Sequence, residues 1–262
     1  MSTPNPNLAA LLANDSDGWR ATLADAVLHI RLANPPVNAI NTAMWHWLHA
    51  TLTAVDDDGA VRSIVITSDT ARLFSAGIDF KELRKDDGAS FGAPGDRRKL
   101  VRETLRLLYS VPVPVVVGVR GAAFGAGAVL PALADLVVGG PSTTFTAAEI
   151  DRGIVGGSRF FARLVGEPLM RKMMLLGCTV SGADLNRVGA FAEFVADEEI
   201  EAVALSLGER LAAKHPVVMR LMKRAHVEVE NMGVIEGYSI EQKYSVIVPA
   251  SVRDDLVPGP SK

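Results

Sequence analysis

The sequence predicts an α/β fold, because two kinds of segment alternate along the chain. The runs SIVIT at residues 63–67 and VVVGV at 115–119 are short, apolar and β-branched, as buried strands are. Between them, residues 98–109 carry apolar side chains at helical spacing. Strands that alternate with helices in this way are typical of an α/β core.

The first part of the chain begins this pattern. Residues 1–18 are rich in Asn, Pro, Ser and Asp, and we expect a flexible lead-in there. Residues 19–32 alternate in polarity and predict a hairpin with its turn near Asp25. Asn41 or Thr42 is suited to cap the helix that follows. The apolar residues of that helix fall on one face and are Met44, Leu48, Leu52 and Val55.

The rest of the chain adds a loop and several helices. Residues 84–98 are polar and glycine-rich, which predicts a mobile loop beside the site. The glycines at 156–157 precede another predicted helix, and Ser181 with Asp184 forms a local capping pattern. The remainder is predominantly helical, with Pro216 at a position suited to a helix start.

The composition restricts the classes of function. A net charge of −3 over 262 residues lacks the basic balance of nucleic-acid-binding proteins, so we expect no nucleic-acid partner. No apolar run approaches the ~20 residues of a membrane span, and no secretory signal is evident. The single cysteine, Cys178, suits a reducing compartment, and we interpret it as a small core residue. We therefore expect a cytoplasmic protein with no membrane association.

A glycine-alanine elbow follows the strand at 115–119. Residues 121–127 read GAAFGAG, and an apolar segment continues from them to Asp135. A chain that turns on small residues and enters a helix presents unpaired amides there, which can hold an anion. Close packing of a helix on a sheet explains the same small residues and is the alternative interpretation.

Three motifs occur in a fixed order around this elbow: RLFSAGIDFKEL at 72–83, RGAAFGAGAVLPALAD at 120–135 and TFTAAEIDRGIVGG at 144–157. With ANPPVNAIN at 33–41, they resemble the crotonase superfamily, the enoyl-CoA hydratase/isomerase family, over about residues 20–245. The resemblance implies a crotonase-like α/β spiral of repeated ββα units over residues 19–195. It also implies a helical C-terminal oligomerisation region at 196–262, and hence a homotrimer or dimer of trimers. A long amphipathic helix packed on its own core would leave the same sequence pattern.

The resemblance assigns roles to three positions. The backbone amides of Ile78 and Ala126 match the family's oxyanion hole, and Glu149 matches one of the two glutamates of typical hydratases. The other glutamate position is occupied by Val129, which can neither donate a proton nor orient water. This departure favours single-base, isomerase-like chemistry over hydration. Isomerases of the family commonly keep the base at the Glu149 position and lack the other.

The resemblance also implies an acyl-CoA substrate, with coenzyme A as part of that substrate, no separate cofactor and no metal. The residues implied to contact the substrate are Val37, Ala39, Ile40, Ser75, Ala76, Gly77, Asp79, Phe124, Gly125 and Thr146. For Asp79, capping of the following helix is the simplest role. The nearest cations to the phosphates are Arg72, Lys81 and Arg84, although solvated side chains explain them too.

Alternatives exist for the remaining polar residues. Glu149 could form an ordinary ion pair with Arg152 or Arg159, and Asp151 and Arg152 are candidates for a second acid, a substrate clamp or plain surface charge. His46 and His49 share a helical face, but no carboxylate or cysteine set completes a metal site, so we interpret them as solvated or packed. Tyr109 and the loop around Phe91 are candidates for the acyl pocket, with ordinary packing as the alternative.

Two classes of function remain at this point. The first is an acyl-CoA enzyme that works through a thioester enolate, with isomerisation favoured and decarboxylation or thioester hydrolysis open on the same scaffold. The second is a non-catalytic acyl-CoA binding or regulatory protein, which the valine at position 129 motivates.

Overall fold

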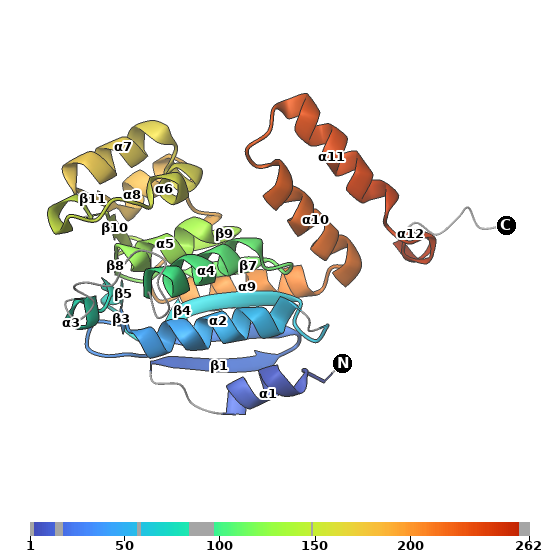
Figure 1. The fold of residues 1–262 in the computed structure, drawn as a ribbon, viewed down its shortest axis with the longest axis horizontal. Helices are drawn as coiled ribbons and strands as arrows, with labels where there is room; N and C mark the ends of the chain where they lie inside the picture. The colour runs from blue at the N-terminus through green and yellow to red at the C-terminus, as the bar shows by residue number, and fades with distance from the viewer. Residues whose placement is uncertain (1–2, 14–17, 57–58, 84–96, 148, 257–262) are drawn as a thin grey trace.

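The chain forms an α/β fold with one large and two small sheets (Figure 1). The computed structural model describes residues 3–13, 18–56, 59–83, 97–147 and 149–256. The large sheet has the strand order β1-β2-β4-β7-β9-β12. Its strands are β1 (Trp19–Ala24), β2 (Val27–Leu32), β4 (Ser63–Ser68), β7 (Val115–Gly118), β9 (Leu136–Gly139) and β12 (Glu193–Phe194). Only the β1–β2 pair is antiparallel, as expected for the hairpin predicted around Asp25.

Two smaller sheets stand beside the ends of these strands. The four-stranded sheet has the order β11-β10-β8-β5, and the two-stranded sheet pairs β3 with β6 in parallel. Their strands are β3 (Ala39–Ile40), β5 (Leu73–Ser75), β6 (Gly77–Ile78), β8 (Ala122–Phe124), β10 (Thr144–Thr146) and β11 (Thr179–Ser181). Parallel pairing of β5, β8 and β10 brings the three sequence motifs side by side.

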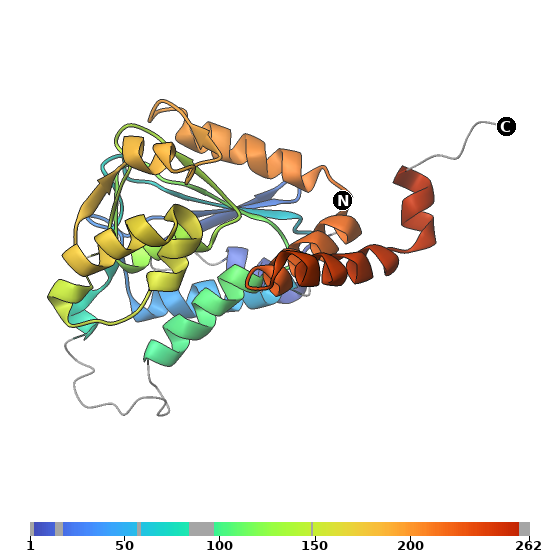
Figure 2. The ribbon, with the colours of Figure 1, turned by 90° about the horizontal axis from the view of Figure 1, so that it is seen from above.

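Helices cover both faces of the large sheet (Figure 2). In the N-terminal half they are α1 (Pro6–Ala13), α2 (Thr42–Asp56), α3 (Phe80–Leu83), α4 (Arg97–Ser110) and α5 (Ala126–Leu133). After the 3-10 turn η1 (Ile150–Arg152) come α6 (Ser158–Val165), α7 (Glu167–Leu176), α8 (Gly182–Arg187), α9 (Ile200–Ala212), α10 (Pro216–Val229), α11 (Val234–Val246) and α12 (Ala250–Leu256). Among the described residues, no helix combines the length and apolar character that crossing a membrane requires.

Alternate strand residues supply two hydrophobic layers, because successive side chains of a strand point to opposite faces. Ile64 and Ile66 belong to the main core, which contains the buried residues of α2, α4 and α5. Val65, between them, packs in a second cluster with Ile200 and Leu207 of α9. The sheet is therefore buried on both sides, which explains why its strands read as continuous apolar runs.

Several sequence predictions are confirmed in detail. The Asn41 side chain accepts a 2.8 Å hydrogen bond from the Met44 amide and caps α2. Asp79 accepts one of the same length from the Lys81 amide at the start of α3. The Ser181 side chain caps α8 through the Asp184 amide.

Other expectations were wrong, or differ from the structure in part. The lead-in at 1–18 contains α1, whose Leu8 is fully buried in the main core, so this stretch is not simply a loose segment. Cys178 is partly exposed rather than buried, because it follows the left-handed Gly177 that ends α7. Within the C-terminal region at 196–262, α9 packs on its own sheet, whereas α11 projects away from the body of the molecule (Figure 1).

Candidate functional site

The elbow joins β8 to α5 through a single strained glycine. Gly125 has φ of 48°, in the left-handed region that suits glycine, and its amide donates a 3.0 Å hydrogen bond to the Thr146 carbonyl of β10. The next residue, Ala126, is the first of α5, so its amide is one of the helix-start donors without an intrahelical acceptor. The predicted transition from strand to helix is therefore confirmed, and it leaves a backbone donor at the turn.

The Ser-Ala-Gly motif rests directly against this elbow. A Cβ added to Gly77, whose φ is 86°, would stand 2.6 Å from the Phe124 carbonyl oxygen and 3.3 Å from the Ala126 nitrogen. Ile78 follows within β6, which pairs with Ala39–Ile40 of β3. The structure thus brings together the backbone segments at Ile78 and Ala126, and glycine at 77 is what permits their approach.

Asn38 fixes the position of the Ser-Ala-Gly segment, and the sequence analysis missed it. This side chain is fully buried, and its Nδ2 donates to Ser68 Oγ at 2.7 Å and to the Phe74 carbonyl at 3.1 Å. Its own carbonyl accepts a 2.7 Å hydrogen bond from Ser75 Oγ. A φ of 48° is tolerated better by asparagine than by most residues, so the Asn in ANPPVNAIN was an available signal.

Glu149 lies on the other side of the elbow. It precedes η1, and its Oε1 would stand 3.3 Å from a Cβ added to Gly125. Its Oε2 is buried and has no hydrogen-bond partner within the described part of the chain. Burial raises the pKa of the Glu149 carboxyl above the ordinary value of 4.5, because desolvation disfavours the charged form.

The alternative interpretation of Glu149, an ordinary ion pair, is wrong. Arg159 instead pairs with Glu167 at 3.0 Å, and the Arg152 guanidinium stands 4.7 Å from the centre of the Phe80 ring. Within the described residues, the half-buried Glu149 carboxylate therefore forms no ion pair, and a shifted pKa in such a position is a common feature of functional sites.

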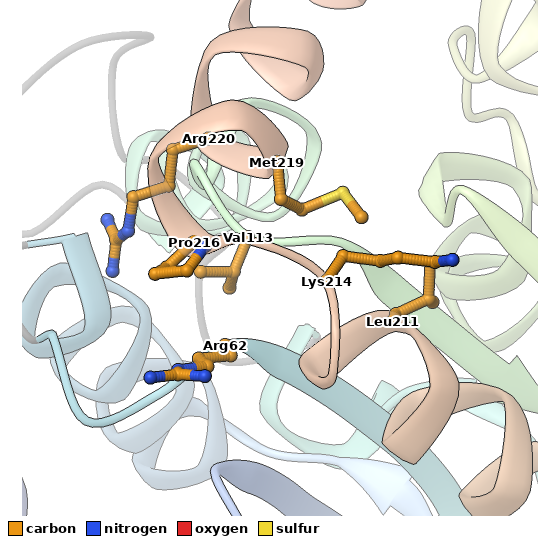
Figure 3. A pocket seen from close by; sticks show the side chains of 7 residues that line it. All are labelled: Arg62, Val113, Leu211, Lys214, Pro216, Met219 and Arg220. Carbon is orange, nitrogen blue, oxygen red and sulfur yellow. The ribbon is translucent and has the colours of Figure 1, made fainter. Parts of the chain in front are cut away.

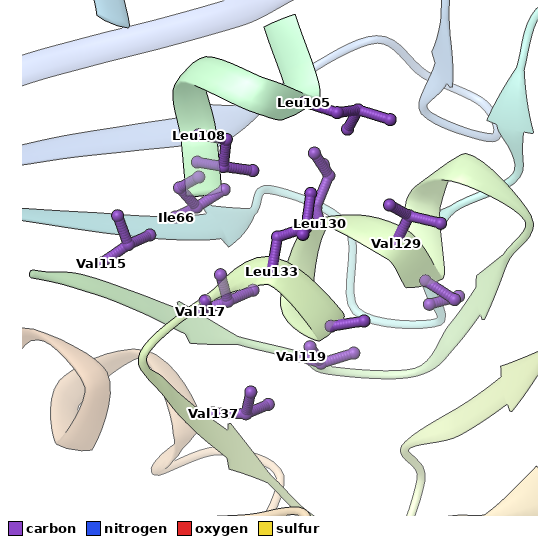
Figure 4. Packing of buried hydrophobic residues seen from close by; sticks show 14 of the residues in the cluster. Ile66, Leu105, Leu108, Val115, Val117, Val119, Val129, Leu130, Leu133 and Val137 are labelled. Atoms are coloured by element: carbon purple, nitrogen blue, oxygen red, sulfur yellow. The ribbon is translucent and has the colours of Figure 1, made fainter. Parts of the chain in front are cut away.

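Val129 is the residue that the resemblance places at the other glutamate position of hydratases. It is 5% exposed on α5, where every residue from Gly127 to Leu133 is buried. Figure 4 places it in the apolar cluster with Leu105 of α4 and its own neighbour Leu130. The residues of α5 bring no titratable group to the elbow, whereas the Glu149 carboxylate lies beside Gly125.

The remaining substrate-contact candidates divide by exposure. Val37 and Phe124 are 42% and 38% exposed, whereas Ile40, Ser75 and Thr146 are buried. The buried Thr146 hydroxyl lies 2.7 Å from that of Thr179. Partial exposure is found at Ala39, Ala76, Asp79 and Gly125, whereas Gly77 is buried.

The weaker candidates differ in where the structure places them. The Tyr109 hydroxyl donates to Glu230 at 2.6 Å, so this side chain is held by α10. Arg72 and Lys81 are exposed cations near the Ser-Ala-Gly motif, and Arg84 and Phe91 lie outside the described residues. No group of three or more potential metal ligands, His46 and His49 included, occurs in the part of the chain that the structure describes.

Two hollows in the surface lie elsewhere. One is lined by Arg62, Val113, Leu211, Lys214, Pro216, Met219 and Arg220 (Figure 3). Since Arg62 and Val113 precede β4 and β7, it adjoins the N-terminal ends of these strands, whereas the elbow follows the C-terminal end of β7. The other, of about 490 Å³, lies between β9, α6 and α10. Neither contains Glu149, Ile78 or Ala126 among its lining residues.

Comparison with known proteins agrees with the motifs. The model of the family described as "Enoyl-CoA hydratase/isomerase" matches residues 22–251. A curated relative from Mycobacterium tuberculosis, (7aS)-7a-methyl-1,5-dioxo-2,3,5,6,7,7a-hexahydro-1H-indene-carboxyl-CoA hydrolase, is 30% identical over 84% of this chain and 87% of its own. The 2,3-dehydroadipyl-CoA hydratase of Escherichia coli is 29% identical over 86% of this chain and 88% of its own.

The fold comparison gives the same answer. The crystal structure of an enoyl-CoA hydratase from Bacillus anthracis superposes with a TM-score of 0.82 at 22% identity, covering 91% of this chain and 94% of that one. The crotonase fold predicted from the motifs is therefore confirmed. Together with the family match over residues 22–251, these similarities show that the chain belongs to the enoyl-CoA hydratase/isomerase family of the crotonase superfamily.

Proposed function

We propose that this protein catalyses proton transfer on an acyl-CoA thioester through an enolate, with Glu149 as the single base. The observation that carries the proposal is the position of the Glu149 carboxylate, with Oε1 against Gly125 and Oε2 buried without a partner. A carboxylate with a raised pKa is a stronger base than an ordinary one.

The backbone supplies the other half of the chemistry. In the proposed reaction the amides of Ile78 and Ala126 donate to the thioester oxygen, which gains negative charge as a Cα proton leaves. One donor of this kind is typically worth about 3 to 4 kcal/mol of transition-state stabilisation. Because the role belongs to the main chain, the inert side chains of these residues do not argue against it.

Isomerisation of a 3-enoyl thioester is the first candidate reaction. Glu149 removes a proton from C2, the electron pair forms a dienolate whose oxygen the two amides hold, and the protonated Glu149 returns the same proton to C4. The double bond moves to C2–C3 with no change in mass. Val129 supports this single-base route over hydration, since an apolar residue that is 5% exposed leaves no second carboxylate to position water.

Thioester hydrolysis is the second candidate. The relative from Mycobacterium tuberculosis supports hydrolytic chemistry on an acyl-CoA, since it is named as a hydrolase of an indene-carboxyl-CoA. In this case Glu149 takes a proton from water, the hydroxide adds to the thioester carbonyl, and the oxyanion collapses to expel the thiolate of coenzyme A, which recovers the proton. One base and the same two amides suffice for these steps.

Assembly into a homotrimer or a dimer of trimers is part of the proposal. Support comes from α11, where Val234 and Ile235 are 88% and 77% exposed and Tyr238 is 58% exposed. Contiguous exposed apolar side chains of this kind are typical of surfaces that pair with another chain.

Turnover of matched 2-enoyl- and 3-enoyl-CoA thioesters by the purified protein tests the proposal, with product mass and free thiol measured together. Isomerisation gives a product of unchanged mass from the 3-enoyl substrate, and hydrolysis releases thiol. Glu149→Gln should abolish either reaction while acyl-CoA still binds. Water addition to the 2-enoyl substrate would contradict the single-base argument, and binding without any turnover would favour a non-catalytic acyl-CoA binding protein.

A further inference from the structure

The residue Arg152 stands one 3-10 turn beyond Glu149. Its amide donates a 3.0 Å hydrogen bond to the Glu149 carbonyl, and residues three apart in such a turn lie on the same side. The two side chains nevertheless do not pair, because the guanidinium is carried away to the Phe80 ring, 4.7 Å from its centre. The Arg152 guanidinium therefore lies over the Phe80 ring and does not form an ion pair with Glu149.

Phe80 lies in the segment that also carries Ile78, one of the two predicted oxyanion donors. It begins α3, two residues after Ile78, and 37% of it is exposed. The contact between Arg152 and Phe80 thus joins the segment that carries the base to the segment that carries the predicted oxyanion donor. A guanidinium over an aromatic face is held in place without losing its hydrogen-bonding edge.

No carboxylate of the described chain takes that edge. Asp151 lies against Gly177, where its Oδ2 would be 2.7 Å from an added Cβ, and Asp79 caps α3. Arg152 forms no ion pair with any residue that the structure describes, whereas Arg159, Arg163 and Arg187 each pair with a carboxylate within 3.0 Å. Arg152 is therefore an exposed cation that lies over the Phe80 ring and has no carboxylate partner among the described residues.

We propose that Arg152 binds a carboxylate on the acyl part of the substrate, so that the preferred substrates are acyl-CoA thioesters carrying a second, distal acid group. The inference rests on the proposed function, since it needs an acyl-CoA in the site. Planar guanidinium matches a carboxylate with two parallel hydrogen bonds, which gives direction as well as attraction.

Equilibrium binding tests this without requiring turnover. Calorimetry with free coenzyme A, a neutral acyl-CoA and an ω-carboxyacyl-CoA of equal length is run on the wild type and on Arg152→Gln. We expect Arg152→Gln to weaken the ω-carboxyacyl-CoA by about 10- to 100-fold, the usual range for a charged hydrogen-bonded group. The other two ligands should bind unchanged, and Arg152→Lys should recover part of the loss.

Two further variants sharpen the test. Arg159→Gln removes a cation that is 73% exposed and already paired, and it should leave all three affinities unchanged. Phe80→Leu removes the aromatic platform and should weaken the ω-carboxyacyl-CoA selectively but less than Arg152→Gln does. Equal losses for all three ligands would mean that Arg152 contacts coenzyme A itself and would overturn the proposal, as would no loss at all. A protein that binds with this selectivity yet turns nothing over would refute only the proposed function.

Discussion

The two segments beside Gly125 differ in what they bring to it. On one side α5 is buried throughout and contributes Val129 to an apolar cluster. On the other side Glu149 and η1 bring a partly desolvated carboxylate and a guanidinium that forms no ion pair with the residues described by the structure. The comparison teaches that the two segments differ in kind: α5 contributes the backbone amide of Ala126 and no titratable side chain, whereas Glu149 and Arg152 come from the segment that joins β10 to η1.

The largest expected effect is the loss of turnover when the Glu149 carboxylate is removed. Glu149→Gln keeps the shape of the side chain and removes its basicity, so turnover should fall by about 10²- to 10⁴-fold. Glu198→Gln, at a carboxylate 77% exposed, is the matched control and should retain full activity. Steady-state kinetics on the preferred thioester measures both, and an active Glu149→Gln protein would remove Glu149 from the mechanism.

Introducing a charge at Val129 of α5 should destabilise the folded state and should not produce hydratase activity. Val129→Glu places a carboxylate where the valine is 5% exposed and packed against apolar neighbours, and the cost should be about 3 kcal/mol in the free energy of unfolding. Val129→Gln separates the effect of charge from that of size. Denaturant titration gives the stabilities, and efficient hydration by a stable Val129→Glu protein would break the comparison.

The packing beneath the elbow offers a smaller perturbation. A Cβ at Gly127 would stand 2.6 Å from the Ser75 Cβ, so Gly127→Ala must push α5 away from β5. We expect about 1 to 3 kcal/mol of destabilisation, with a loss of activity because the two amide donors separate. Gly59→Ala, where nothing lies within 4 Å, is the control and should change neither the melting temperature nor turnover.

The smallest expected effect is a displaced pH dependence. Because burial raises the pKa of Glu149 above 4.5 and the base acts only when ionised, kcat/KM should fall with decreasing pH through a pKa higher than that of an ordinary glutamate. The folded state also binds this proton more readily than the unfolded chain does. Its contribution to stability is therefore largest at low pH and is lost as the pH rises through the raised pKa.

The raised pKa of Glu149 also predicts how the stability of the Glu149→Gln variant, relative to that of the wild type, changes with pH. The difference in melting temperature between Glu149→Gln and the wild type should increase in favour of the variant from about pH 4.5 upward, as the wild-type carboxylate becomes charged. A difference that does not change with pH would mean that the Glu149 carboxyl is not desolvated.

Sequence patterns predicted the elements of this protein better than the partnerships between its side chains. The hairpin, the α2 cap at Asn41 and the elbow follow from local rules that act over a few residues. The burial of Leu8 and the partial exposure of Cys178 depend on which surfaces meet in the fold, and neither residue carries that information locally.

For the candidate site, the motifs predicted which backbone segments meet but not how the charges are shared. Whether Glu149 would pair with Arg152 was open in the sequence, since the spacing of three permits it. The answer came from Phe80, which is distant in the sequence and near in the fold. The roles of Ile78, Ala126 and Glu149 in catalysis stay predictions until the variants are measured.

The parallel pairing of β5, β8 and β10 also bears on how the chain acquires its activity. Leu73–Ser75, Ala122–Phe124 and Thr144–Thr146 are hydrogen-bonded neighbours although many residues separate them along the chain. Contacts between distant segments form late, because loop closure must precede them. Recovery of turnover after dilution from denaturant should accordingly lag behind recovery of helical circular dichroism, and during synthesis this three-stranded arrangement cannot exist before Thr146 has left the ribosome.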